Sequence, residues 1–106
     1  MQFRTLGSTG LDVSVVGVGT WQFGGEWGAE YTQPEVNAIF DAAREADINL
    51  IDTAECYGDH LSEGFVGEAI KQDRERWVLA TKFGHHFNAL FDRDQLWSAA
   101  EVQKQL

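Results

Sequence analysis

Three side chains suited to acid–base chemistry follow two neighbouring apolar segments of the chain. Asp52 ends the segment 48–51, Lys82 ends the segment 77–81, and Tyr57 lies five positions after Asp52. If both segments are parallel strands, their ends lie at one edge of a sheet, about 4.8 Å apart. An aspartate–lysine pair then spans the two strand ends naturally, and the loop that carries Tyr57 lies over the pair.

This trio has the composition of a proton donor. A free tyrosine titrates near pH ~10, and an ammonium group beside it favours the phenolate, which makes the phenol a stronger acid. A carboxylate next to the lysine keeps the ammonium charged and oriented. The alternative is that Asp52 caps a turn, Tyr57 packs in a loop and Lys82 is a solvated charge. The residues alone leave both interpretations open.

The elements that position these residues alternate between strand and helix. The sequence predicts a hairpin over about 1–12 and βα units over about 13–47, 48–73 and 77–106. The apolar run 13–18 is typical of a strand covered on both faces. Thr32 and Glu35 predict a helix start with a capping box, with Pro34 in the first turn. Ser62 is expected to cap the second helix, residues 83–93 to form a loop, and residues 94–106 to be helical.

Strict alternation indicates an α/β fold with a parallel sheet built from right-handed βαβ units. An eight-stranded barrel takes about 250 residues, whereas this chain has 106. Three units would leave one sheet face and two strand edges uncovered. We therefore expect a fragment truncated after about three βα units, or a chain that needs a partner.

Composition narrows the range of partners and locations. The formal net charge of −9 opposes binding to nucleic acid or to an anionic membrane surface. No apolar run approaches the roughly 20 residues of a membrane span, and the N-terminus lacks the pattern of a signal peptide. Cys56 is the only cysteine, so no internal disulfide can form. The simplest expectation is a cytoplasmic location.

The histidines do not follow a metal-binding motif. His60, His85 and His86 show no spacing such as H-E-x-x-H. Adjacent residues of an extended segment point in opposite directions, so at most one of His85 and His86 faces any one site. The sequence therefore predicts no metal site, and Cys56 is expected to be a loop or packing residue.

The motifs, taken in order, resemble the N-terminal third of the aldo-keto reductases. They are Arg4-Thr5-Leu6-Gly7, Thr9-Gly10-Leu11, Val18-Gly19-Thr20-Trp21, Asp52-Thr53-Ala54-Glu55-Cys56-Tyr57-Gly58, Ser62-Glu63, Gly67-Glu68-Ala69-Ile70 and Ala80-Thr81-Lys82. The resemblance covers nearly the whole chain. It implies a (β/α)8 TIM barrel whose bottom is closed by an N-terminal β-hairpin, and NADPH-dependent reduction of aldehydes or ketones to alcohols.

The resemblance also implies roles for individual residues. Tyr57 would be the general acid that protonates the carbonyl oxygen of a small-molecule substrate. Lys82 would make that phenol more acidic, and Asp52 would hold Lys82. Gly19, Thr20 and Trp21, together with Asp52, would lie beside the cofactor.

The chain also departs from the family's pattern. The family's catalytic histidine, at the end of strand four, has no counterpart, and neither do the loops after strands seven and eight that hold the cofactor's phosphates. We therefore expect this chain alone to be inactive and to bind NADPH weakly. Two other functions stay open: a non-catalytic module that completes a barrel with a partner or a second copy, and an enzyme in which Lys82 forms a Schiff base.

Overall fold

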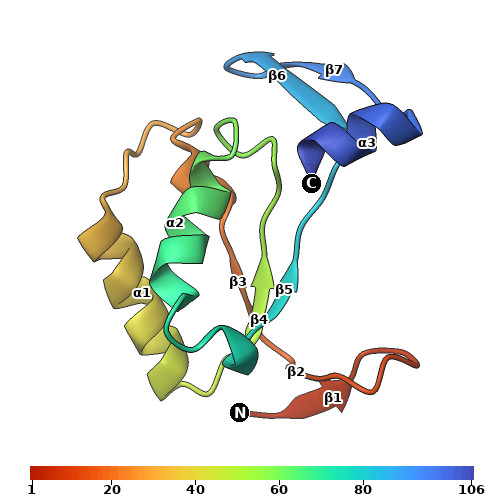
Figure 1. Ribbon diagram of the computed structural model, residues 1–106. Helices are drawn as coiled ribbons and strands as arrows, with labels where there is room; N and C mark the ends of the chain where they lie inside the picture. The colour runs from red at the N-terminus through yellow and green to blue at the C-terminus, as the bar shows by residue number, and fades with distance from the viewer.

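The computed structural model describes all residues from 1 to 106, and its centre is a parallel sheet of three short strands (Figure 1). The strands lie in the order β3 (Gly17–Gly19), β4 (Leu50–Asp52) and β5 (Val78–Ala80). Two helices, α1 (Gln33–Glu45) and α2 (Leu61–Ile70), pack side by side on one face of this sheet. The predicted alternation of strand and helix is therefore confirmed from β3 to β5.

The core lies between this sheet and the two helices. Val18, Ile51 and Leu79 are aligned across the three strands and pack on the helix side. Alternation along a strand places Leu50 and Val78 on the opposite face, which no helix covers (Figure 1). The buried apolar cluster consists of Phe23, Val36, Phe40, Ala43, Ile51, Val66, Ile70 and Trp77.

The start of α1 agrees with the sequence prediction. Thr32 is the N-cap, and the Glu35 carboxylate accepts hydrogen bonds from the backbone N–H and from the hydroxyl of Thr32, both at 2.8 Å. Both bonds lower the pKa of Glu35, the one from the backbone N–H contributing more. Pro34 lies in the first turn, where its missing N–H costs nothing.

The N-terminal hairpin consists of β1 (Phe3–Thr5) and β2 (Asp12–Ser14), paired antiparallel. The predicted single strand over 13–18 is wrong. Its first part pairs with β1, the chain bends at Val15 and Val16, which are about half exposed, and β3 begins only at Gly17. Asn49 joins the hairpin to the sheet, because its side-chain oxygen accepts from the Ser14 N–H at 2.8 Å and its amide donates to the Asp12 carbonyl at 2.9 Å.

A second hairpin follows the sheet, where the sequence predicts a loop over 83–93; that prediction is wrong. The hairpin consists of β6 (His85–Ala89) and β7 (Asp92–Gln95) and precedes a short helix, α3 (Ala99–Gln105). Pairing of 92–95 with β6 also shortens the helix expected over 94–106. Figure 1 shows this hairpin beyond the upper ends of the parallel strands, far from β1 and β2. No helix of the protein has the length and apolar character that crossing a bilayer requires.

Candidate functional site

The three predicted acid–base residues meet at the carboxyl ends of the parallel strands. The Lys82 ammonium donates to both carboxylate oxygens of Asp52 at 3.0 Å and to the Tyr57 hydroxyl at 3.3 Å. It also donates to the Thr53 carbonyl at 2.8 Å. Pairing of Asp52 with Ala80 across β4 and β5 places the aspartate and the lysine on neighbouring chain segments. The structure thus joins phenol, ammonium and carboxylate in a single contact group.

The surroundings of Lys82 keep its ammonium charged. Burial by itself lowers the pKa of Lys82, but the hydrogen bonds and the charge interactions with Asp52 and Tyr57 together outweigh burial and raise that pKa above its ordinary value. The Asp52–Lys82 pair remains about half exposed. A molecule that binds at the carboxyl ends of the parallel strands, called the rim from here on, can therefore reach Asp52, Tyr57 and Lys82. The site therefore has a permanent cation 3.3 Å from a phenol oxygen.

A buried hydroxyl network below this rim fixes the strand ends. The Ser62 hydroxyl lies 2.9 Å from the Thr20 carbonyl, 2.8 Å from the Thr20 hydroxyl and 3.1 Å from the Thr53 hydroxyl. The Thr20 hydroxyl donates in turn to the Asp52 carbonyl at 3.0 Å. The prediction that Ser62 caps α2 is wrong: His60 occupies the N-cap position, and the Ser62 side chain points into the protein.

The loop that carries Tyr57 is held by direct contact between two backbones. Gly24, at the end of η1 (Trp21–Gly24), lies against Gly58, which has a φ of +69°. A Cβ on Gly24 would lie 2.6 Å from the Tyr57 carbonyl carbon, and one on Gly58 would lie 2.4 Å from the Gly24 oxygen. Only glycine at both positions permits this approach, which fixes the backbone beside the phenol.

Aromatic rings form a hollow of about 330 Å³ next to Tyr57. Trp21 packs edge-on against Trp27, and Trp27 packs edge-on against Phe91 from the β6–β7 hairpin. Arg93 holds the hairpin here, because it forms an ion pair with the buried Glu26 and donates to the Cys56 carbonyl at 2.7 Å. The hollow can take an apolar group of a ligand whose polar end reaches the phenol.

The residues expected beside a cofactor lie at the same rim but differ in exposure. The Trp21 side chain is 39% exposed, and the space around the Gly19 Cα is open. Thr20, in contrast, is fully buried and hydrogen-bonded within the protein. Its backbone N–H and carbonyl are also hydrogen-bonded within the protein, so Thr20 supports the rim from below.

Cys56 lies in the loop that carries Tyr57, directly before the tyrosine, but its thiol is not activated. Burial, aided by the negative charge of Glu55, raises the pKa of Cys56 above its ordinary value. The thiol is therefore protonated at neutral pH, unlike a cysteine nucleophile.

Several residues that shape this site were missed from the sequence. Ser62, Gly24, Glu26 and Arg93 act through contacts with residues far away along the chain, of which the Glu26–Arg93 ion pair is the longest in sequence. The opposite charges of Glu26 and Arg93 within two aromatic-rich segments were the only available signal. Such a signal does not identify a pair unless the segments are known to meet.

Comparison with known proteins identifies the class to which this fold and site belong. The model of the Aldo/keto reductase family matches residues 15–106, and the chain belongs to this family of oxidoreductases. Its α/β fold matches solved aldo-keto reductase structures. The family predicted from the motifs is thus confirmed.

Individual relatives support the same assignment. The chain is 41% identical over 85 residues to the aldo-keto reductase YhdN of Bacillus subtilis. This alignment covers 77% of the chain and 25% of YhdN. Among solved structures, PA4992, an inferred aldo-keto reductase of Pseudomonas aeruginosa, is 37% identical with a TM-score of 0.86 and covers 97% of the chain and 39% of that protein. An aldo-keto reductase of Klebsiella pneumoniae in complex with NADPH is 32% identical with a TM-score of 0.63, over 78% of the chain and 28% of that protein. The chain spans about a quarter of the length of the curated relatives it matches.

Proposed function

We propose that Asp52, Tyr57 and Lys82 form the proton-donating part of a site that reduces aldehydes or ketones to alcohols. The observation that carries this proposal is the position of the Lys82 ammonium, 3.3 Å from the Tyr57 oxygen and 3.0 Å from both Asp52 oxygens. A cation there stabilises the phenolate that remains after the phenol has given up its proton. The carbonyl oxygen of the substrate accepts this proton and becomes the alcohol hydroxyl.

NADPH is the cofactor that fits this rim, and when bound it supplies the hydride for the carbonyl carbon. The fit rests on the open space at Gly19 and on the exposed face of Trp21, against which a flat ring can lie. Asp52 contributes through its hold on Lys82. A reductase from Klebsiella pneumoniae that resembles this chain has been solved with NADPH.

In the full-length protein we expect the parallel strands to form part of a (β/α)8 barrel. The hairpin over about 1–12 would close its bottom, followed by βα units over about 13–47, 48–73 and 77–106. The face of the sheet that carries Leu50 and Val78 is uncovered in this chain. The remaining strands of a barrel would cover it and would supply a histidine and the phosphate-binding loops.

The decisive test is Tyr57→Phe in the full-length protein. Loss of the phenolic proton is expected to lower kcat for carbonyl reduction at least 10²-fold and to leave the affinity for NADPH within about twofold. Tyr31→Phe, which changes a half-buried tyrosine outside the rim, is the matched control. Activity retained in Tyr57→Phe would remove the phenol from the proposed role.

The 106-residue chain by itself is expected to show no turnover. It can be assayed for NADPH oxidation that depends on an added aldehyde, beside the full-length protein. Turnover at an ordinary enzyme rate of about 1–10³ per second would contradict the proposed need for further strands.

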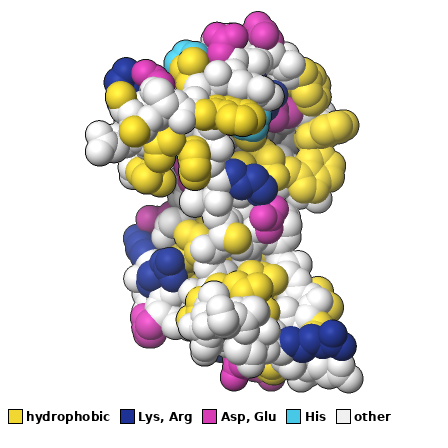
Figure 2. All heavy atoms as spheres, turned by 90° about the vertical axis from the view of Figure 1, so that its right-hand side faces the viewer, with side chains coloured by type: hydrophobic (Ala, Val, Ile, Leu, Met, Phe, Trp, Pro, Cys, Tyr) yellow, Lys and Arg dark blue, Asp and Glu magenta, His cyan; other side chains and the backbone are white.

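A second candidate function is assembly, in which two copies of this chain cover each other's open sheet face. It is favoured by the uncovered Leu50 and Val78 and by the hydrophobic side chains on that side of the molecule, which Figure 2 shows gathered mainly over its upper part. Light scattering on the chain decides between the two. A dimer supports assembly, whereas a monomer that unfolds cooperatively contradicts it.

A further inference from the structure

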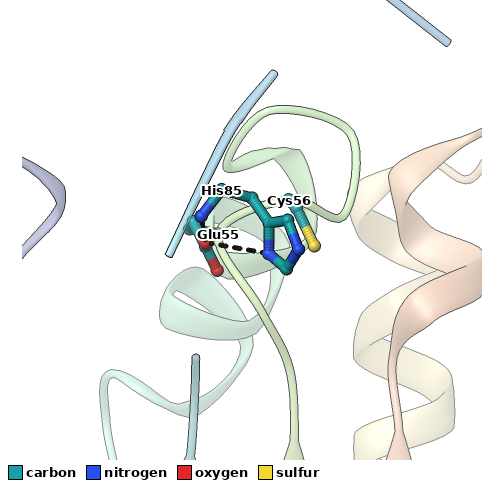
Figure 3. A group of neighbouring side chains, drawn as sticks. All are labelled: Glu55, Cys56 and His85. Atoms are coloured by element: carbon teal, nitrogen blue, oxygen red, sulfur yellow. Dashed lines mark hydrogen bonds and ion pairs between the residues drawn. The ribbon is translucent and has the colours of Figure 1, made fainter. Parts of the chain in front are cut away.

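A second group of chemistry-bearing side chains lies behind the loop that carries Tyr57. Glu55 and Cys56 come from the segment after β4, and His85 is the first residue of β6. Their potential ligand atoms, a carboxylate oxygen, a sulfur and a ring nitrogen, all lie within 4.8 Å of one another. Figure 3 shows the imidazole ring of His85 between the carboxylate of Glu55 and the sulfur of Cys56.

Two polar atoms of this group are buried without a hydrogen-bond partner. The Glu55 side chain is only 4% exposed, and while its Oε1 accepts from the His85 backbone N–H at 2.9 Å, its Oε2 has no partner. The Nδ1 atom of His85 is buried without a partner as well, because its distance of 3.7 Å from Glu55 Oε1 is too long for a hydrogen bond. A buried polar group without a partner destabilises the protein, and more so when the group is charged. A cation between these atoms would remove that destabilisation.

From this geometry we infer that Glu55, Cys56 and His85 bind a zinc ion. Sulfur and imidazole nitrogen select zinc over calcium or magnesium, which prefer oxygen ligands only. In a tetrahedral zinc site, neighbouring ligand atoms lie roughly 3.5 Å apart. The ligand atoms, which lie within 4.8 Å of one another, therefore approach by up to about 1.3 Å through side-chain rotation when the ion binds.

The charge and the surroundings of the group agree with this assignment. Binding displaces the thiol proton of Cys56 to solvent, and the resulting thiolate and the Glu55 carboxylate together balance the two charges of Zn²⁺. A hollow of about 420 Å³ adjoins all three residues, which gives the ion a path of entry and leaves room for water as a fourth ligand. The neighbouring His86 is exposed and also lines this hollow, but it is not part of the group of three ligand atoms.

A zinc ion at this site would link the loop that carries Tyr57 to the β6–β7 hairpin. Glu55 and Cys56 immediately precede Tyr57, whereas His85 begins the hairpin that supplies Phe91 to the aromatic hollow. A bound ion would fix these two segments relative to each other. The inference does not depend on the proposed reductase activity, since it needs only metal binding.

The test measures metal binding directly on the protein at its natural length. The protein is stripped with a chelator and titrated with ZnCl₂ in competition with a coloured zinc indicator, then separately with CoCl₂ under reducing conditions. We expect one Zn²⁺ per chain with a dissociation constant of micromolar or below, and with cobalt a thiolate-to-metal charge-transfer absorption. Absence of that absorption in the unmodified protein would overturn the inference, whatever the variants do.

Substitutions then identify the ligands. Cys56→Ser is expected to abolish the charge-transfer band and to weaken zinc binding at least tenfold, and Glu55→Gln and His85→Gln to weaken it similarly. His86→Gln is the matched control and should bind as the unmodified protein does. Circular dichroism of each variant without metal shows whether it is folded. Equal zinc affinity in Cys56→Ser and in the unmodified protein would contradict the assignment.

Discussion

At the scale of single residues, the Lys82 ammonium connects the groups of the rim. It reaches a carboxylate, a phenol and the Thr53 carbonyl, all within 3.3 Å. These three partners together fix the direction in which each N–H of the ammonium points. The properties of the rim therefore depend on where the Lys82 charge lies as well as on its presence.

Removal of this charge is therefore expected to affect the chemical step. Lys82→Met in the full-length protein should lower kcat for carbonyl reduction by about 10²–10⁴-fold, with a change in NADPH affinity of less than about threefold. Steady-state kinetics and a separate binding titration measure the two quantities. Lys71→Met, which removes an exposed lysine paired with Glu68 on α2, is the control. If both variants lose equal activity, Lys82 has no special place in the reaction.

The buried hydroxyl of Ser62 leads to a prediction on stability. Ser62→Ala leaves the hydroxyls of Thr20 and Thr53 short of a partner and should lower the free energy of unfolding by about 1–3 kcal/mol. Ser8→Ala, in the exposed turn of the first hairpin, should change it by less than about 0.5 kcal/mol. Urea unfolding of both variants measures the difference. Equal values would show that the network contributes nothing.

The roles of individual residues could be predicted from the sequence only where they depend on the spacing of residues along a strand or helix. Asp52 and Lys82 follow apolar strands, so the parallel arrangement alone brings them together. The local pattern around Ser62 predicts a helix cap, because serine before an apolar stretch is typical of an N-cap. The actual role of Ser62 depends on the Thr20 backbone, 42 positions away, and no local pattern encodes that contact.

At the scale of elements, α1 and α2 are joined to the segment before β5 through Arg44. This arginine donates to both carboxylate oxygens of Asp73, at 2.8 and 2.9 Å, and to the Ala69 carbonyl at 2.8 Å. The hydrogen bonds from Arg44 are the main reason why the pKa of Asp73 falls from 3.8 to about 2.

The ion pair of Arg44 with Asp73 predicts that the protein loses stability as the pH falls through the acidic range. Because the folded pKa of Asp73 is depressed, its stabilising effect is full above the unfolded value of 3.8 and is lost as the pH falls towards about 2. Asp73→Asn should therefore cost about 1–2 kcal/mol at pH 7 and much less near pH 2. Asp41→Asn, at the more exposed partner of Arg44, is the control and should have a smaller effect. Denaturant unfolding across this range is the measurement, and a cost that does not change with pH would contradict the assignment.

The contact between Gly24 and Gly58 predicts a sharper loss. Gly58→Ala introduces a Cβ at 2.4 Å from the Gly24 oxygen at a φ of +69°, whereas Gly28→Ala adds one at a φ of +81° in open space. Both carry the conformational cost of about 1–2 kcal/mol, so the difference between them isolates the clash. We expect Gly58→Ala to be less stable than Gly28→Ala by at least about 1 kcal/mol in thermal or urea unfolding. Equal destabilisation would mean that the two loops can separate freely.

Elements with strong local signals were predictable, and the second hairpin was not. The Thr32–Glu35 pair and the apolar stripe of α1 specify a helix without help from the rest of the chain. The turn between β6 and β7 has Phe91 at a φ of +60°, where hairpin turns usually have glycine or asparagine. The turn therefore has no recognisable sequence signature. Its position is held instead by the ion pair of Arg93 with Glu26.

At the scale of the whole molecule, the two hairpins lie at opposite ends of the parallel strands (Figure 1). The first is joined to the sheet by Asn49, and the second is joined to the rim by Arg93. The uncovered face of the sheet runs between them. The chain thus presents two kinds of surface: the Asp52–Tyr57–Lys82 group with the adjoining aromatic hollow, which share Tyr57, and an open apolar face of the sheet.

The overall arrangement predicts that ligand preference and proton transfer respond to different substitutions. Phe91→Ala in the full-length protein should enlarge the hollow and raise KM for bulky apolar aldehydes several-fold, with kcat for a small aldehyde nearly unchanged. Leu90→Ala, at the adjacent exposed position, is the control. A large fall in kcat for every aldehyde would mean that the hairpin takes part in the chemistry itself.

The backbone contact of Gly24 with Gly58 also bears on how relatives of this protein can diverge. An insertion in either of these two loops would displace the phenol, so their lengths should be nearly invariant among active relatives. The β6–β7 hairpin, in contrast, is held to the rest of the chain by contacts that each involve a side chain, Arg93 and Glu55 among them, so we expect it to tolerate changes of length and composition better. We therefore expect new substrate preferences within this lineage to arise by exchange of that hairpin, while the reaction itself is inherited without change.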